Sequence, residues 1–211
     1  TLTMVGVDGY RIAICKEKMN ESTEDISFVV PGKTLSKISK MLNENSDSNV
    51  DISVSSRHVI FKIDRYVVFS RLLEGEFIDY KRACPKDFQT TLKVNTRELL
   101  QSVQRVSLLI NDRLRSPVVC DFSSGTGEIN LVCNTEMGKA SDSVNAKISG
   151  NDVHIGFNGK YLEEALTNSD CDEIKIGLNS ALSPMSIMPD DGDSFLFLVL
   201  PVRLKNTGNS V

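Results

Sequence analysis

The side chains best suited to chemistry are two histidines and one group of aspartates, and their spacing favours no catalytic or metal site. His58 and His154 lie beside strand-like residues, without a cysteine or carboxylate at a recognised ligand spacing. Residues 190–193 (Asp-Asp-Gly-Asp) carry three aspartates, but the distal glutamate of a calcium loop is missing, so a hairpin turn is the better interpretation. Residues 125–127 (Gly-Thr-Gly) lie in a predicted hairpin and do not open a helix, which excludes a phosphate cradle.

The five cysteines are spaced irregularly and form no Cys-x-x-Cys pair. This pattern favours neither a disulfide framework nor a zinc site, and a reducing cytoplasm fits it best. Since no ligand set or catalytic constellation is found, we expect no cofactor and no metal.

Length and composition describe an ordinary globular chain. It has 211 residues, of which 40% are hydrophobic and 25% charged, enough for one large domain or two modest ones. There is no signal peptide, transmembrane run or lipidation motif, so no membrane role is expected. The net charge of -4 argues against uniform attraction to nucleic acid, but it does not describe the charge of single faces.

The most apolar run, residues 195–204 (Phe-Leu-Phe-Leu-Val-Leu-Pro-Val-Arg-Leu), lies almost at the end of the chain. A run of this length predicts a strand covered on both faces. Pro201 cannot donate a backbone hydrogen bond, so the strand should end there and leave a short tail, where we expect a binding site.

Two segments about 125 residues apart repeat one order of elements, which indicates tandem copies of a small domain. A Gly-Lys pair opens the helix of each copy. The first copy is predicted as a strand at 26–30, an amphipathic helix with Leu35, Ile38 and Leu42, and strands at 50–54, 59–63 and 66–72. The second is predicted as a strand at 153–157, a helix with Leu162, Ala165 and Leu166, and strands at 174–178, 185–188 and 195–200.

Each copy has a leading part. An Asp-Gly turn at 8–9 predicts a hairpin at the start of the chain, and Asn95 with Glu98 predicts the capped start of a helix over 96–110. A hairpin of 118–122 with 129–133 follows. The first copy has about half as many leading residues, so we expect the chain to be a fragment. The predicted domains are 1–86, incomplete at its start, and 87–204, joined by a linker at 85–90 and followed by a tail at 205–211.

Four stretches resemble the signature sequences of the bacterial DNA sliding clamp, the beta subunit of DNA polymerase III. They are Val-Asp-Gly-Tyr-Arg-Ile-Ala at 7–13, Leu-Glu-Gly-Glu-Phe-Ile-Asp-Tyr-Lys-Arg at 73–82, Gly-Phe-Asn-Gly-Lys-Tyr-Leu at 156–162 and Leu-Pro-Val-Arg-Leu at 200–204. All four occur in the family's order and spacing. The resemblance covers the later part of the clamp's second domain and all of its third.

The resemblance implies an α+β fold of tandem DNA-clamp domains, with antiparallel sheets on the outer side and short helices on the inner side. Clamps are two-subunit rings that encircle double-stranded DNA without sequence preference and carry out no catalysis. The implied partners are therefore duplex DNA, a second subunit in the full-length protein, and the polymerase III catalytic subunit, clamp loader and repair polymerases, which bind through short peptides.

Two further groups of residues acquire roles from the resemblance. One helix face is cationic and a second is polar, opposite their apolar faces, and a solvated surface is the simpler reading of each. In clamps such helices face DNA, which assigns that role to Lys33, Lys37, Lys40, Arg97, Gln101 and Arg105. Leu108 and Leu109 match positions that contact the first domain of the neighbouring subunit.

The resemblance also implies a pocket for client peptides between the two domains. Apolar side chains should supply most of its affinity, while Arg11 and Arg203 fix the register of the peptide. Core packing is the competing interpretation, above all for Leu198 and Ile12. The implied pocket residues are Asp8, Gly9, Tyr10, Arg11, Ile12, Ile78, Arg82, Ala83, Asn158, Tyr161, Leu182, Pro184, Leu198, Leu200, Pro201, Val202, Arg203 and Leu204.

The pocket departs from the usual family pattern at several positions. Ile78 replaces a common proline, Tyr10 replaces a frequent histidine, and Leu200 and Val202 replace methionines. These changes keep the pocket apolar, and the resemblance leaves its exact peptide preference open. The competing function is a small α+β hydrolase or transferase that uses Asp8 and Arg11 in the same cleft.

Overall fold

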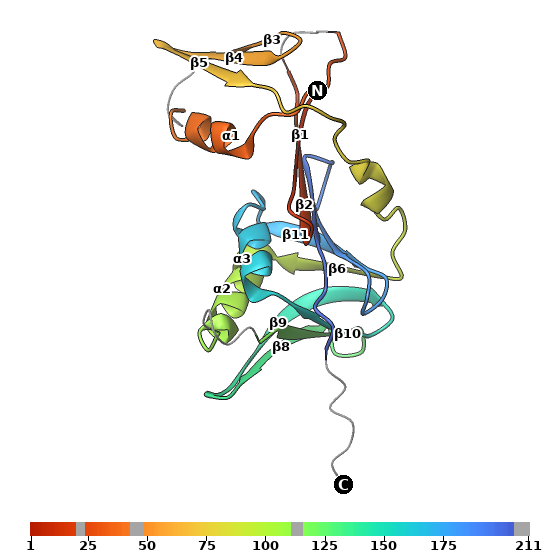
Figure 1. The fold of residues 1–211 in the computed structure, drawn as a ribbon. Coiled ribbons are helices and arrows are strands. Elements are labelled where there is room, and N and C mark those ends of the chain that lie inside the picture. The colour runs from red at the N-terminus through yellow and green to blue at the C-terminus, as the bar shows by residue number, and fades with distance from the viewer. Residues whose placement is uncertain (20–23, 43–48, 111–115, 205–211) are drawn as a thin grey trace. The chain divides into compact units, whose positions relative to one another are not determined.

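A computed structural model describes residues 1–19, 24–42, 49–110 and 116–204 (Figure 1). The chain divides into two compact units, one of Thr1–Met19 with Tyr80–Val211 and one of Asn20–Asp79. This division differs from the predicted domains 1–86 and 87–204 because the first 19 residues pair with C-terminal strands; the domain limits themselves stay a prediction. The predicted tail at 205–211 lies outside the described residues.

The larger unit is built on one antiparallel sheet, whose described strands follow the order β1-β2-β13-β12-β11-β6-β9-β8-β7-β10. Its strands are β1 (Leu2–Val7), β2 (Arg11–Glu17), β6 (Thr90–Asn95), β7 (Val118–Ser123), β8 (Glu128–Thr135), β9 (Gly138–Gly150), β10 (Val153–Phe157), β11 (Glu173–Leu178), β12 (Met185–Pro189) and β13 (Phe195–Val199). Its helices are α2 (Thr96–Ser107), α3 (Gly159–Thr167) and the short 3-10 helix η1 (Tyr80–Ala83). The predicted α+β class, with antiparallel sheets and few helices, is confirmed.

Most of this unit is a repeat of one five-element motif. β6-α2-β7-β8-β9 is followed by β10-α3-β11-β12-β13, and the halves exchange partners, because β11 pairs with β6 and β10 pairs with β7. Helices α2 and α3 lie side by side (Figure 1), and Gln104 of α2 donates a hydrogen bond to Glu163 of α3 at 3.0 Å. The core therefore forms between these two helices and the sheet.

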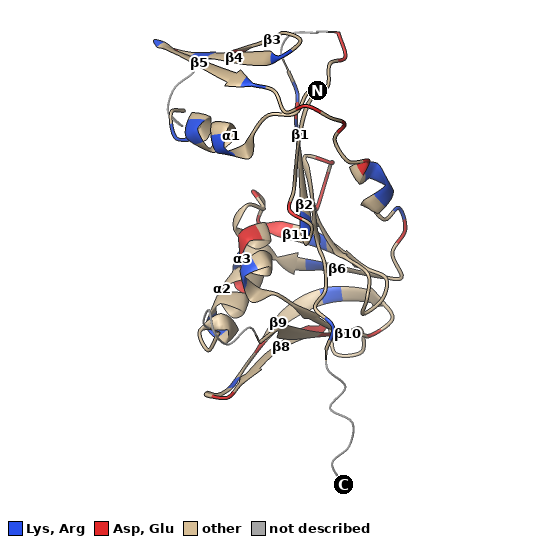
Figure 2. Ribbon diagram, viewed as in Figure 1, with Lys and Arg blue, Asp and Glu red and all other residues tan. Residues whose placement is uncertain are grey.

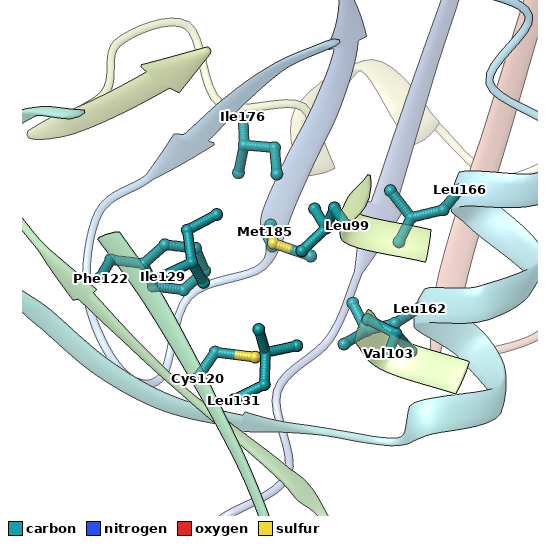
Figure 3. A pocket seen from close by; sticks show the side chains of 10 residues that line it. All are labelled: Leu99, Val103, Cys120, Phe122, Ile129, Leu131, Leu162, Leu166, Ile176 and Met185. Atoms are coloured by element: carbon teal, nitrogen blue, oxygen red, sulfur yellow. The ribbon is translucent and has the colours of Figure 1, made fainter. Parts of the chain in front are cut away.

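The periodic apolar residues of both helices and the alternate residues of the strands fill this core. Leu99, Val103 and Val106 of α2 are buried, as the helical spacing predicts. A cavity of about 10 Å³ remains, lined only by apolar and sulfur-bearing side chains (Figure 3). A water molecule needs roughly 10–15 Å³ and polar partners, so this cavity stays dry and offers no ligand site. The Cys120 thiol lines it, and burial followed by the nearby Asp121 charge raises the pKa of Cys120 to about 12.

The smaller unit packs one helix on a three-stranded sheet. Helix α1 (Gly32–Ser39) covers the antiparallel strands β3 (Val50–Val54), β4 (His58–Ile63) and β5 (Tyr66–Arg71), and Ile38 of α1 is buried with Phe61 of β4. Leu42, predicted on the apolar face, follows the helix end and is exposed. The predicted strand at 26–30 is wrong. Among described residues this segment accepts one backbone hydrogen bond, from Leu73 to Val29 at 2.9 Å, and forms no ladder.

In the larger unit, the start of α2 agrees with the sequence, whereas its end and two strands differ from the prediction. Asn95 caps α2 by accepting from the Glu98 amide at 3.0 Å, as predicted, although α2 ends at Ser107 rather than at 110. Strands β6 and β9 were not predicted, because polar and small residues dominate both. Phe88, in the predicted linker, lies directly over Gly177, so this segment is anchored to the sheet.

The aspartate-rich turn at 190–193 joins β12 to β13, as predicted, and its carboxylates pair with lysines. Asp190 binds the Lys93 ammonium at 2.6 Å, and Asp193 binds Lys16. Among the described residues no group of acidic, histidine or cysteine side chains could hold a metal ion, and all five cysteines are free thiols. In the same described part of the chain, no helix is both long and apolar enough to cross a membrane.

Gly150 permits the close approach of two chain segments. Its φ is +113°, and a Cβ there would lie 2.1 Å from the Gln89 carbonyl oxygen. We predict that Gly150→Ala lowers the free energy of unfolding by about 2–3 kcal/mol, because both the positive φ and the backbone contact oppose a side chain.

Urea unfolding of Gly150→Ala and Gly125→Ala measures this difference. Gly125 lies in a hairpin with open space around its Cβ position, so its substitution should change the free energy of unfolding by less than about 0.5 kcal/mol. Equal effects of the two substitutions would contradict the prediction.

Candidate functional site

The pocket predicted from the sequence centres on the end of three adjacent strands of the larger unit. In this register Ser186 of β12 lies opposite Leu198 of β13, which lies opposite Ile12 of β2. One step further along, the Leu200 amide donates to the Tyr10 carbonyl at 2.9 Å. The β1–β2 hairpin and the C-terminal strand are therefore joined directly by backbone hydrogen bonds.

The turn of the β1–β2 hairpin is held by Asp8. Asp8 Oδ1 accepts the backbone amides of Tyr10 at 3.1 Å and Arg11 at 3.2 Å, and Gly9 takes the positive φ of +86°. This is the local geometry that an Asp-Gly pair favours. The turn fixes the positions of the two side chains that follow it.

Arg11 connects this turn to helix α3. Its Nε donates to Asp8 Oδ2 at 2.8 Å and its Nη1 donates to Glu164. The guanidinium carbon lies 4.4 Å from the centre of the Tyr161 ring, within cation–π range. The Tyr10 ring stacks on the same tyrosine with a centroid distance of 6.0 Å. Two tyrosines and one arginine thus form a single cluster.

Helix α3 places Tyr161 in its first turn. Asn158 is the N-cap, and its Oδ1 accepts the Lys160 amide at 3.0 Å. The side-chain oxygen of Asn158, predicted as a pocket residue, is therefore used by the helix. Lys160 lies 4.0 Å from Glu164, one helical turn further along α3.

The tail after β13 crosses to strand β10. Pro201 interrupts the ladder, and the Val202 amide then donates to the Gly156 carbonyl at 2.8 Å in an isolated antiparallel bridge. The absence of a side chain at Gly156 leaves room for the Leu204 side chain, because a Cβ at Gly156 would lie 2.5 Å from Leu204 Cδ2. The sequence predicted that the strand would end at Pro201 but gave no partner for the tail.

Exposure separates the predicted pocket residues into two groups. Leu182 is 69% exposed, Tyr10 61%, Leu200 39% and Val202 38%, so these four offer apolar surface. Leu198 is 2% exposed and belongs to the interior, as the competing interpretation of core packing allowed.

The remaining predicted pocket residues are placed as follows. Gly9, Arg203, Arg82 and Ala83 are exposed, the last two on η1, and Pro184 and Pro201 are half-buried. Ile78 is exposed at 55% but belongs to the smaller unit.

Glu164 is the residue that sequence reasoning missed. It is not among the predicted pocket residues, yet its carboxylate binds Arg11, 153 positions away. A helical spacing of three residues from Tyr161 was the available signal, since residues at i and i+3 share one face. The strand register that brings Arg11 to α3 could not be inferred from that spacing.

Charge at the site is balanced locally. Burial alone would raise the pKa of Asp8, but hydrogen bonds from the Arg11 guanidinium and from the Tyr10 and Arg11 amides outweigh it, so the pKa of Asp8 lies below its usual value. Burial alone would lower the pKa of Arg11, but bonds to Asp8 and Glu164 raise it. Asp8 and Arg11 therefore both carry their charges throughout the physiological pH range. Among Asp8, Tyr10, Arg11, Tyr161 and Glu164, no nucleophile is paired with a base.

The predicted DNA-facing residues lie on exposed helix faces. Lys33 and Lys37 lie on α1 and Lys40 is its C-cap, and Figure 2 shows the blue of basic residues along this helix. The matching residues of α2, Arg97, Gln101 and Arg105, are exposed. Arg105 is held by Asp142 at 2.6 Å.

The two predicted interface leucines lie at the end of α2 and differ in exposure. Leu108 is 82% exposed, which is a large apolar surface for one side chain, and Leu109 is half-buried.

The fit of Leu204 on Gly156 generates one prediction. Gly156→Ala should displace the Leu204 side chain while preserving the fold, because the nearest obstacle is the end of a flexible side chain. Amide hydrogen exchange at Val202, whose N–H bonds to Gly156, should accelerate by roughly tenfold. Unchanged exchange at Val202, or accelerated exchange throughout the core strands, would contradict it.

The ionisation of Asp8 generates a second prediction. A folded-state pKa below the usual 3.8 contributes stability that is fully present above pH 3.8 and is lost as pH falls through the lower folded value. The unaltered chain should therefore be more stable than Asp8→Ala at pH 6, and the charge-dependent part of this difference should shrink as the pH falls below 3.8. Urea unfolding of both proteins from pH 7 to pH 2.5 measures it, and a difference that grows below pH 3.8 would contradict the assignment.

Comparison with known proteins identifies relatives over nearly the whole chain. Residues 81–203 match the family model described as DNA polymerase III beta subunit, C-terminal domain, and residues 1–79 match its central domain. The chain is 34% identical over 207 residues to the beta sliding clamp of Halalkalibacterium halodurans. The aligned region covers 96% of this chain and 54% of that protein. The chain thus spans about half the length of the relatives it matches.

Solved structures agree with these matches. The DNA polymerase sliding clamp of Bacillus subtilis superposes with a TM-score of 0.90 at 32% identity, covering 96% of this chain and 54% of that one. A sliding clamp from Bartonella birtlesii bound to griselimycin superposes with a TM-score of 0.86 at 30% identity, covering 96% of this chain and 54% of the other.

Proposed function

The chain belongs to the DNA polymerase III beta subunit family, the bacterial sliding clamps, and from this premise we propose that it is part of a DNA polymerase processivity factor. In this role a ring encircles duplex DNA without sequence preference and offers client peptides a common docking site. The role is non-catalytic and cytoplasmic. The observation that carries it is that two adjoining clamp domain matches, 1–79 and 81–203, account for nearly every residue of one continuous chain.

We propose that client peptides bind at the exposed apolar edge formed by the β1–β2 hairpin, the β11–β12 loop and the C-terminal tail. Leu182, Leu200 and Val202 offer apolar surface there, and Tyr10 adds an aromatic ring. Backbone groups of the exposed tail and Arg203 would fix the register of an extended peptide. The Bartonella birtlesii sliding clamp is bound to griselimycin, which supports the idea that a protein of this fold can accept a ligand.

The partners of this site would be the polymerase III catalytic subunit, the clamp loader and repair polymerases. Each would present a short peptide motif, so the partners would compete with one another.

We propose that the cationic face of α1 contacts DNA phosphates. Lys33, Lys37 and Lys40 lie within one turn or two of each other on an exposed face, and such an array attracts phosphates without reading bases. On α2, Arg97 and Gln101 would act similarly. The contribution of Arg105 should be smaller because Asp142 already neutralises it.

We propose that Leu108 and Leu109 contribute to the contact between subunits of the full-length ring. The 82% exposure of Leu108 supports this role, since so exposed a leucine gains from being covered. The competing hydrolase or transferase function is not favoured, because the related proteins are sliding clamps and the Asp8–Arg11 pair has no nucleophile beside it.

Peptide binding tests the proposal. A fluorescent peptide of the Gln-Leu-x-Leu-Phe type should bind the chain with micromolar affinity, measured by fluorescence polarisation. The double substitution Leu200→Ala with Arg203→Ala should weaken binding by roughly tenfold or more, since it removes apolar contact area and a register-fixing donor.

The matched control is Leu108→Ala with Arg97→Ala, which removes the same residue types from exposed positions on α2. The control should bind as the unaltered chain does, and circular dichroism should show that both double variants remain folded. Unchanged affinity in the Leu200 and Arg203 variant would refute the placement of the site, and no binding by the unaltered chain would refute the proposed peptide-binding function.

A further inference from the structure

We propose that Glu164 is a positioning residue of the peptide site: it holds the Arg11 guanidinium against Tyr161 and so fixes the tyrosine pair beside the apolar edge. This inference rests on the proposed function, and it adds a residue and a role that family resemblance did not supply. It also revises the role of Arg11, which the sequence suggested would contact the peptide directly.

Two carboxylates and one aromatic ring hold the Arg11 guanidinium in place. A guanidinium has five N–H donors in one plane, and two of its nitrogens are engaged by carboxylates from different elements. Asp8, in the hairpin turn, takes Nε at 2.8 Å, and Glu164, on α3, takes Nη1. The guanidinium carbon lies over the Tyr161 ring, 4.4 Å from the ring centre. Arg11 is thus fixed along two edges and one face.

Glu164 connects the Arg11 guanidinium to helix α3. Asp8 lies three residues from Arg11 in the same hairpin, so their ion pair makes no connection from Arg11 to α3. Glu164 and Tyr161 lie three residues apart on one face of α3, and they bind the edge and the face of the same guanidinium. Removing the Glu164 carboxylate would leave only the ring contact between Arg11 and the helix.

The two stacked tyrosines link Arg11 to the surface that a ligand would meet. The Arg11 side chain is 31% exposed, whereas Tyr10 is 61% exposed and stacks on Tyr161. The Tyr10 carbonyl also accepts the Leu200 amide, which links the tyrosine pair to the apolar tail. A peptide at this edge would touch Tyr10 and Leu200, while Arg11 and Glu164 act from beneath by holding both tyrosines in place.

A double-mutant cycle tests this inference. Glu164→Ala and Arg11→Ala should each weaken binding of the Gln-Leu-x-Leu-Phe peptide by roughly fivefold, as expected for a partly exposed ion pair with a positioning role. The double variant should be no weaker than either single variant within about twofold, because both changes remove one interaction. Glu164→Gln, which retains an acceptor oxygen for Arg11, should recover part of the lost affinity.

The near-ultraviolet circular dichroism of the tyrosines gives an independent readout. The chain has four tyrosines and no tryptophan, so the Tyr10–Tyr161 pair is half of the tyrosine content, and its signal should change in Glu164→Ala. The matched control is Glu163→Ala, which removes the same charge from the adjacent residue of α3, where the carboxylate binds Gln104. It should leave the affinity unchanged.

The outcomes separate this inference from the proposed function. If the unaltered chain binds the peptide and Glu164→Ala binds equally well, Glu164 has no positioning role and the proposed function stands. Fully additive losses in the double variant, or an equal loss in Glu163→Ala, would also overturn the inference. If the unaltered chain does not bind, the proposed function fails and the positioning role fails with it.

Discussion

The pairing of β2 with β13 is the interaction on which the rest of the site depends. Arg11 to Cys15 pair with Val199 to Phe195 in antiparallel register, which joins the first hairpin of the chain to its last strand. Side chains alternate between the two faces of a strand, so this register sends Arg11 towards α3 and Ile12 to the opposite face beside Leu198. A slip of one residue would exchange these positions and separate Arg11 from Glu164.

Pro201 determines how the C-terminal strand ends and therefore what the site exposes. In the first half of the repeat, β9 runs for 13 residues and pairs with β8 and then with β6. In the second half, β13 stops before Pro201, and the chain reaches β10 only through the Val202–Gly156 bridge. Proline cannot donate to a ladder, so the interruption follows from its chemistry. As a result, Leu200 and Val202 stay partly exposed. An unbroken strand would instead continue the ladder through both residues.

The sequence predicted most elements whose pattern is strong and missed those whose pattern is weak. Helix α2 and the Asp8-Gly9 turn carry clear caps and turn residues, and both form as expected. Strand β9 alternates polar residues with small ones such as Ala140 and Ala146, so its pattern does not stand out from a loop. The segment 26–30 has the composition of a strand, but a strand also requires a paired neighbour. The Arg11–Glu164 contact depends on strand register, which local sequence does not encode.

The helices of the two units use their charges differently. On α3, Glu163 binds Gln104 and Glu164 binds Arg11, so both carboxylates are committed to contacts within the larger unit. On α1, Lys33 and Lys37 form no ion pair with any described residue. A lysine that is already paired with a carboxylate gains little binding free energy from a phosphate. A lysine without such a partner displaces a counterion from the DNA when it binds a phosphate. The net charge of -4 is compatible with a cationic helix face, because a net charge does not describe how charges are distributed over single faces.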